Sequence, residues 1–310
     1  MKKNKIISSI IVFLSIVSSF GELYCQGVSM TPSLSKSEVK KCQENVVRNG
    51  SMKDYRDLWT YWSEAGENTE LLIPYALILA IRYDNEEACG EVFWLVERYY
   101  KEKKMEMDDN TMAFLLVLLE KGAALGSESC ARYLRDLYLK EEYLPRDTVL
   151  AVAYLEEGAN LGNSILYCDL GKLYMKGEYV QKDMDKAVEY LEKGADEGDF
   201  GCISNLHRIY LKGMDVEQDI PKAIEYLEKG IEKGVSNCFH SLGNLYIEGE
   251  YVQQDIARGL AYLEEGGERN NIVCLQELYS LYKEGKYVQK DLNKAKEYER
   301  KRWKIMTKGH

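Results

Sequence analysis

Between residues 127 and 306, apolar and small residues recur in columns that repeat every 36 positions. Within one row, Leu170, Leu173 and Tyr174 have the i, i+3, i+4 spacing of one helix face. Tyr190 and Leu191 supply a second apolar face further along the same row. A period between about 20 and 50 residues is typical of stacked repeats, so the pattern predicts a series of helix pairs. The recurring columns start at Tyr138, Leu144, Asp147, Ala151 and Tyr154 in the first row and at Gly177 in the second.

Residues between the two faces predict how each pair turns. Gly177 stands where the first helix should end, because glycine accepts the left-handed backbone of a helix C-terminus. Asp183 stands at the N-cap of the second helix, where its carboxylate can accept free amides. Pro221 fits the first turn of a second helix. We therefore expect an all-α fold, a right-handed α-solenoid of helix-turn-helix repeats with period 36, whose five repeats span 127–162, 163–198, 199–234, 235–270 and 271–306.

Upstream of these rows the period fades. Residues 51–126 keep a helical pattern, and we interpret them as divergent repeats or an N-terminal cap that covers the apolar end of the stack. Residues 27–50 are predicted to form a loose linker. The expected core residues of the N-terminal third are Trp59, Trp62, Trp94 and Tyr99.

The repeat resembles the Sel-one-like repeat, a relative of the tetratricopeptide repeat, over about residues 127–306. The resemblance implies a helical solenoid whose first helices line a concave, partner-binding side. His207, Tyr279 and Arg135 depart from the pattern, because they replace the glycine that normally follows the leucine. The residues that carry the resemblance are Leu242, Gly243, Tyr246, Gly249, Val252 and Asp255, with Lys186, Ala187 and Tyr190 in an earlier row.

By the same resemblance, the partner-facing positions lie on the first helix of each pair. In the first three rows these positions hold six cations and one acid, which predicts a basic stretch from Arg132 to Lys212. Such a stretch suits an acidic peptide segment, since electrostatic complementarity steers association. The alternative is that these lysines only solvate a helix face. The candidate partner-binding residues are Arg132, Asp136, Lys140, Lys172, Lys176, Ser204, Arg208, Lys212, His240 and Asn244.

The first 26 residues have the pattern of a signal peptide. Lys2, Lys3 and Lys5 precede an apolar run over residues 6–20. An uncleaved anchor is the alternative, but fifteen helical residues reach only about 22 Å, short of a bilayer core of about 30 Å. We expect an exported chain, periplasmic or extracellular, with no membrane span after signal cleavage. Its net charge of −10 argues against nucleic-acid binding.

The chain has eight cysteines, and four of them occupy one column of the repeat. Equivalent helices in a stack lie about 8 to 10 Å apart, whereas a disulfide needs α-carbons within about 7 Å. We therefore expect buried thiols that pack as small apolar residues, rather than a disulfide ladder or a metal site. A disulfide between Cys42 and Cys89 is a remaining alternative. The column holds Cys130, Cys202, Cys238 and Cys274.

No group of residues has the spacing of an active site. Of the three histidines, His207 fills a packing column. We expect no cofactor and no metal, and a non-catalytic scaffold or adaptor that binds another protein. The alternative is an enzyme, since some cysteine-rich members of the family have been linked to penicillin-like compounds. We expect no serine–lysine motif for such acyl transfer.

Overall fold

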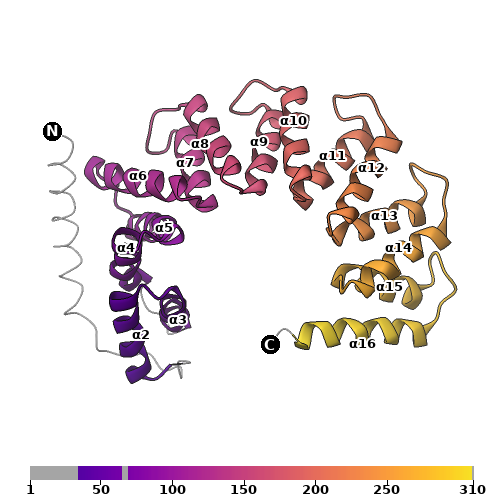
Figure 1. The fold of residues 1–310 in the computed structure, drawn as a ribbon, viewed down its shortest axis with the longest axis horizontal. Coiled ribbons are helices and arrows are strands. Elements are labelled where there is room, and N and C mark those ends of the chain that lie inside the picture. Colours follow the sequence, from indigo (N-terminus) through magenta and orange to yellow (C-terminus); the bar gives the residue numbers. More distant parts are fainter. Residues whose placement is uncertain (1–33, 65–68, 309–310) are drawn as a thin grey trace. The chain divides into compact units, whose positions relative to one another are not determined.

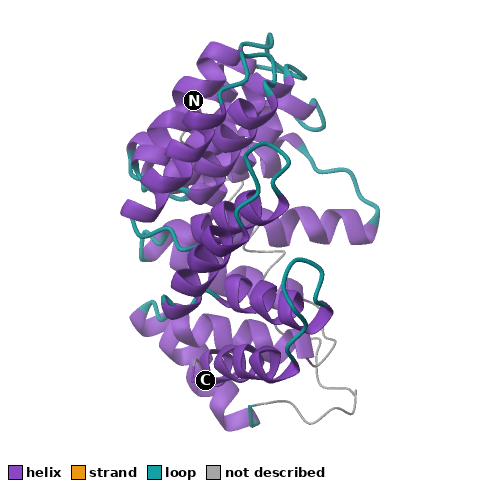
Figure 2. Cartoon of the chain, turned by 90° about the vertical axis from the view of Figure 1, so that its right-hand side faces the viewer, coloured by secondary structure: helices purple, strands orange, loops and turns teal. Residues whose placement is uncertain are grey.

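The computed structural model describes residues 34–64 and 69–308. Within those ranges the only regular secondary structure is helical (Figure 2), which confirms the predicted all-α fold of stacked helix pairs. The predicted signal peptide, residues 1–26, lies outside the described residues. None of the described helices has the length and apolar character that a membrane span requires. The chain divides into two compact units, residues 1–163 and 164–310, and we describe each by itself.

The second unit holds four helix pairs that follow one another along the chain (Figure 1). The second helices begin at residues 184, 220, 256 and 292, so the structure keeps the 36-residue period of the sequence. The helices are α9 (Ser164–Lys176), α10 (Met184–Asp196), α11 (Phe200–Lys212), α12 (Ile220–Glu232), α13 (Asn237–Glu248), α14 (Ile256–Glu268), α15 (Ile272–Glu284) and α16 (Leu292–Lys308).

A stacked pair of tyrosines joins the two helices of each of these repeats. The ring centroids of Tyr174 and Tyr190 lie 5.8 Å apart, with ring planes 14° from parallel. A cation from the first turn of the second helix covers the first ring, as where Lys222 Nζ lies 4.2 Å from the centroid of Tyr210. The two tyrosine columns therefore form a joint, a stacked contact between the two helices of a repeat, that recurs along the second unit. The same joint recurs at Tyr210–Tyr226, Tyr246–Tyr262 and Tyr282–Tyr298.

The turn inside each repeat is built as the sequence predicts. The backbone N–H of Lys186 donates to the Asp183 carboxylate at 3.0 Å, which caps α10. The N–H of Asp183 itself donates to the carbonyl of Tyr174 at 3.1 Å and ties α10 to α9. Gly177 adopts a left-handed backbone with φ of 65°. These contacts confirm the predicted cap and helix end.

The column cysteines pack against glycines of the preceding helix. A side chain on Gly194 would clash with the sulfur of Cys202, and Gly230 stands in the same relation to Cys238. Both cysteines are fully buried. The column therefore packs as small apolar residues, as predicted.

In residues 34–64 and 69–163, the described part of the first unit, seven α-helices and one short 3-10 helix pack together. The prediction of a linker over residues 27–50 is wrong for Lys36–Asn49, which form a helix. Ser35 and Glu38 make a capping box at its start, and its buried face carries Cys42 and Val46 at i, i+4 spacing. The elements are α2 (Lys36–Asn49), α3 (Met52–Glu64), η1 (Thr69–Leu72), α4 (Ile73–Arg82), α5 (Glu86–Lys103), α6 (Asp109–Ala124), α7 (Glu128–Lys140) and α8 (Thr148–Asn160).

Candidate binding sites

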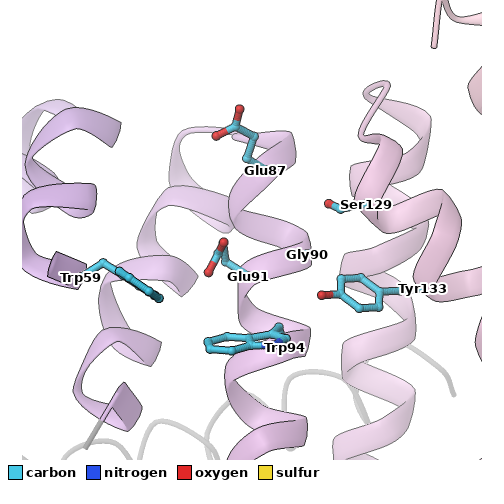
Figure 3. A pocket seen from close by; sticks show the side chains of 7 residues that line it. All are labelled: Trp59, Glu87, Gly90, Glu91, Trp94, Ser129 and Tyr133. Atoms are coloured by element: carbon cyan, nitrogen blue, oxygen red, sulfur yellow. The ribbon is translucent and has the colours of Figure 1, made fainter. Parts of the chain in front are cut away.

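A cavity of about 340 Å³ lies among α3, α5 and α7 in the first unit (Figure 3). Its size falls within the range of ligand pockets. Indole, phenol and carboxylate groups line it together, which is an unusual mixture for a packing defect in a helical core. The lining residues are Trp59 of α3, Glu87, Gly90, Glu91 and Trp94 of α5, and Ser129 and Tyr133 of α7.

Helical spacing places the α5 residues on one face. Glu87, Glu91 and Trp94 follow at i, i+4 and i+7, so their side chains lie along one side of the helix. Gly90 lies between them, against α7. A Cβ atom on Gly90 would approach the Ser129 hydroxyl oxygen to 2.7 Å, so the absence of a side chain lets α5 and α7 come close. This close approach puts Tyr133 at the same cavity.

The two carboxylates differ in their partners. Arg56 Nη2 lies 2.7 Å from a carboxylate oxygen of Glu87 and neutralises it. No hydrogen bond or ion pair joins Glu91 to any residue that the structure describes. Burial, together with the neighbouring Glu87, raises the pKa of Glu91, while Arg56 lowers it to a smaller extent. Burial and the charge of Glu91 raise the pKa of Tyr133 to about 12.

Sequence reasoning missed this cavity. Trp62 is 6% exposed and belongs to the core as predicted, but Trp59 is 38% exposed, so its assignment to the core is wrong. Trp94 and Tyr99 are half-buried. A signal was available in α5, where the charged Glu91 interrupts an otherwise apolar stretch directly after Gly90.

The candidate partner-binding residues of the first unit lie on α7 and are paired within that helix. Arg132 forms an ion pair with Glu128. The carboxylate of Asp136 accepts hydrogen bonds from Arg135 and from Lys140, each at 2.7 Å. Both predicted cations of α7 thus have an acidic partner one helical turn away, and this helix contributes little net positive charge.

In the second unit the predicted cations lie on α9 and α11, which pack against each other. Lys172 and Lys176 of α9 are exposed, as are Arg208 and Lys212 of α11. Over residues 164–308, none of these four has a carboxylate within ion-pair distance. Ser204 is half-buried on α11. These two helices therefore carry an uncompensated basic surface.

The last two candidate residues, His240 and Asn244, lie on α13, which is the first helix of the following repeat. Asn244 Nδ2 and His240 Nε2 are 3.1 Å apart. His240 Nε2 is also 4.0 Å from a carboxylate oxygen of Glu277 on α15, an ion pair only when the imidazole is protonated. The basic surface consequently ends at α11, and α13 presents Asn244, His240 and the exposed acid Glu248 instead of lysine or arginine.

Beside the basic surface lies a cluster of polar groups around Cys168. The sulfurs of Cys168 and Cys202 and a carboxylate oxygen of Asp199 all lie within 4.8 Å of one another. Asn205 Nδ2 donates to the Cys168 sulfur at 3.5 Å. Cys168 stands in the same column as the candidate residues Arg132 and Ser204, which predicts that it faces a partner. It is only 1% exposed, so that prediction is wrong.

The cluster perturbs both thiols. A hydrogen bond from Cys202 lowers the pKa of Cys168, and the Lys172 ammonium lowers it further. The same hydrogen bond and burial raise the pKa of Cys202. Two thiols and a carboxylate could also hold a metal ion, but Asp199 already caps α11 by accepting from the Cys202 amide at 2.7 Å. In the first unit, Cys42, Asp54 and Asp57 form a comparable group of three donors.

Comparisons with solved structures return helical repeat proteins at low sequence identity. A Sel1 repeat protein from Oxalobacter formigenes has 18% identity and a TM-score of 0.49, over 86% of this chain and 99% of that one. The protective antigen c5321 of uropathogenic Escherichia coli, which has an SLR fold, has 18% identity and a TM-score of 0.46, over 89% and 62%. The immunity protein Pa5087 from Pseudomonas aeruginosa has 16% identity and a TM-score of 0.41, over 62% and 73%.

A comparison with the curated proteins finds no match. The comparison with protein-family models identifies one repeat family. The Sel1 repeat matches five times in succession, in phase with the helix pairs from α7 to α16, at residues 129–163, 166–199, 208–235, 240–271 and 279–300. The chain belongs to the Sel1 repeat family.

Proposed function

We propose that this chain is a non-catalytic scaffold outside the cytoplasm that binds an acidic segment of a partner protein on α9 and α11. Sel1 repeats typically serve as protein–protein interaction scaffolds. The observation that carries the choice of partner is the set of four exposed cations, Lys172, Lys176, Arg208 and Lys212, without carboxylate partners in a chain of net charge −10. Two packed helices that keep such a surface unpaired are suited to opposite charge.

Export is proposed from the N-terminal pattern of three lysines and an apolar run. Outside the cytoplasm, an adaptor meets envelope or host proteins, whose acidic loops are the proposed class of partner.

The enzyme alternative has less support. The expectation of no serine–lysine motif is wrong, since Ser37 and Lys40 have the Ser-x-x-Lys spacing used in acyl transfer, but both side chains are exposed on α2. A nucleophile of this kind requires a base within hydrogen-bond reach in a shaped site, and neither residue lines the cavity among α3, α5 and α7.

The test uses the full mature chain and a fluorescein-labelled peptide of alternating Glu and Leu, with a Gln and Leu peptide as the neutral control. At low salt we expect saturable binding of the acidic peptide only. The variant K172E/R208E/K212E should weaken it at least about tenfold. A matched variant, K193E/K229E/K233E, makes the same charge change on the second helices and should bind as the parent does. Equal loss in both variants, or none in either, would refute the proposed surface.

A further inference from the structure

We infer that the cavity among α3, α5 and α7 is a binding site for an organic cation, an ammonium or guanidinium group, and this site is independent of the basic surface on α9 and α11. Figure 3 shows Trp59 and Trp94 on two sides of the Glu91 carboxylate, with the Tyr133 hydroxyl directed toward the same space. Aromatic faces attract cations through their quadrupoles, and indole does so best. The two indoles and the phenol therefore form the walls of a cation site.

Glu91 supplies the charge. Its carboxylate is half-buried at the cavity and has no ion pair among the described residues, whereas the neighbouring Glu87 is already bound to Arg56. A desolvated carboxylate without a partner is costly, and a cation in the cavity would remove that cost. The buried hydroxyl of Tyr55 on α3 also lacks a hydrogen-bond partner among the described residues. The fold thus leaves the charge of Glu91 without a direct partner at the cavity.

Other ligand classes fit poorly. The unpaired carboxylate of Glu91 repels an anion. A hard metal ion needs several oxygen ligands, but only Glu91 offers a free carboxylate and the remaining walls are aromatic. A neutral apolar ligand would leave Glu91 desolvated and unpaired. The volume of about 340 Å³ suits a quaternary ammonium head or the end of a lysine or arginine side chain.

The test titrates the full chain with choline and with its neutral isostere 3,3-dimethyl-1-butanol, and follows tryptophan fluorescence and heat. Choline should bind saturably, and the isostere at least about tenfold more weakly. Acetyl-lysine methylamide and acetyl-arginine methylamide form a second arm. Stronger binding of these two would identify a partner's side chain as the source of the cation, and stronger binding of choline would identify a free small molecule.

Glu91→Gln should abolish the preference for choline over its isostere, and Trp59→Leu should weaken choline binding by about tenfold. Glu106→Gln, an exposed change in the same unit, and Trp303→Leu, an exposed tryptophan of the second unit, are the matched controls and should bind normally. A merely structural Glu91 would lower the melting temperature when neutralised; the inference requires Glu91→Gln to raise it without ligand. Absence of saturable binding of all three cations, or equal binding of the isostere, would overturn the inference.

In the second unit we infer that Cys168 and Cys202 form a disulfide when the chain folds in an oxidising compartment. Their sulfurs lie within 4.8 Å, and both side chains are buried. This interface differs from the equivalent ones in the repeat. Gly201 stands where Asn237 and Val273 occur in later rows, and a Cβ atom there would come within 3.1 Å of the Cys168 sulfur. Because Gly201 has no side chain, the Cys168 thiol of α9 can face α11 and lie near Cys202.

The oxidant is a disulfide of the glutathione class. The Cys168 thiolate, stabilised by Lys172, attacks one sulfur of oxidised glutathione and releases one glutathione thiolate. The Cys202 thiolate then attacks the Cys168 sulfur of the mixed disulfide and releases the second. The two protein thiols lose two protons and two electrons, and one oxidised glutathione becomes two thiols. Exchange takes place while α9 docks on α11, before the sulfurs are buried.

The test refolds the full chain in a mixture of oxidised and reduced glutathione, alkylates it in denaturant, and maps unreduced peptides. A single peptide linking Cys168 to Cys202 is expected. Cys238→Ser should keep this link, and Cys168→Ser, which installs the residue found at Ser204 in the next row, should leave Cys202 alkylated. Free thiols at both positions in the parent chain, or bound zinc that protects them from oxidation, would contradict the inference.

Discussion

The sulfur of Cys202 occupies the space into which a side chain on Gly194 would project, so α10 and α11 pack closely at this point. Gly194→Ala should therefore destabilise the second unit by about 1 to 3 kcal/mol through overpacking, even though alanine favours a helix. Denaturant unfolding measures this change. In the reduced chain, where Cys202 is a thiol, Cys202→Ala makes room for the new methyl group, and the double variant should recover much of the loss. Strict additivity of the two changes would show that the two positions do not touch.

The helix end at Glu141 carries strain that the other repeats avoid. Glu141 adopts φ of 55° where Gly177, Gly213, Gly249 and Gly285 stand in later rows. A residue with a Cβ atom pays about 1 to 2 kcal/mol for left-handed backbone. Glu141→Gly should therefore stabilise the first unit by about 1 kcal/mol, despite the loss of an exposed ion pair with Arg146. The reciprocal change, Gly177→Ala, should destabilise the second unit. A lower unfolding midpoint for Glu141→Gly would contradict this reading of the turn.

Tyrosines of the joint should differ in their contribution to stability. Tyr246 is 7% exposed, stacks on Tyr262 with centroids 5.9 Å apart, and lies under the Arg258 guanidinium. Tyr246→Ala should cost about 3 to 5 kcal/mol. Tyr210 is only half-buried, so Tyr210→Ala should cost less. Lys229→Ala, which removes an exposed ion pair to Asp196, should cost about 0 to 1 kcal/mol. Similar melting temperatures for Tyr246→Ala and Lys229→Ala would contradict the burial of the joint.

Glu91 should make the fold less stable as pH rises. Its pKa in the folded chain is above the ordinary 4.5, because burial and Glu87 disfavour the charged form. The folded state therefore binds the proton more tightly than the unfolded state, and this stability is present below about pH 4.5 and lost as pH rises through the folded pKa. Glu91→Gln should be more stable than the parent at pH 7 and match it near pH 4. An unfolding series across that range measures the difference, and a constant offset would disprove the link to ionisation.

The sequence predicts most of the repeat region because each column has one physical role. The Asp183 column supplies a helix cap, and the columns of Tyr174 and Tyr190 supply a stacked tyrosine pair. Because each column recurs in five rows, the rows reinforce one another. Upstream, the period is lost, and nothing in the pattern of α3 and α5 separates the pocket-lining Trp59 from the buried Trp62. Charge pairing is also invisible to a column count, which includes Arg132 as a cation but leaves out its ion-pair partner Glu128.

The prediction that Cys168 faces a partner is wrong for a local reason. Column spacing places it among partner-facing residues, but Gly201 leaves space on α11 into which the thiol fits. Whether the Cys168 side chain points inward depends on which residues of the next repeat pack against it. Only the packed structure shows those neighbours.

Association kinetics test the proposed scaffold most directly. Stopped-flow mixing of the full chain with the Glu and Leu peptide, from low ionic strength to about 0.5 M salt, reports whether unpaired cations steer the encounter. We predict an association rate that falls steeply with salt for the parent chain and stays flat for K172E/R208E/K212E. A parent rate that does not change with salt would contradict a basic binding surface on α9 and α11.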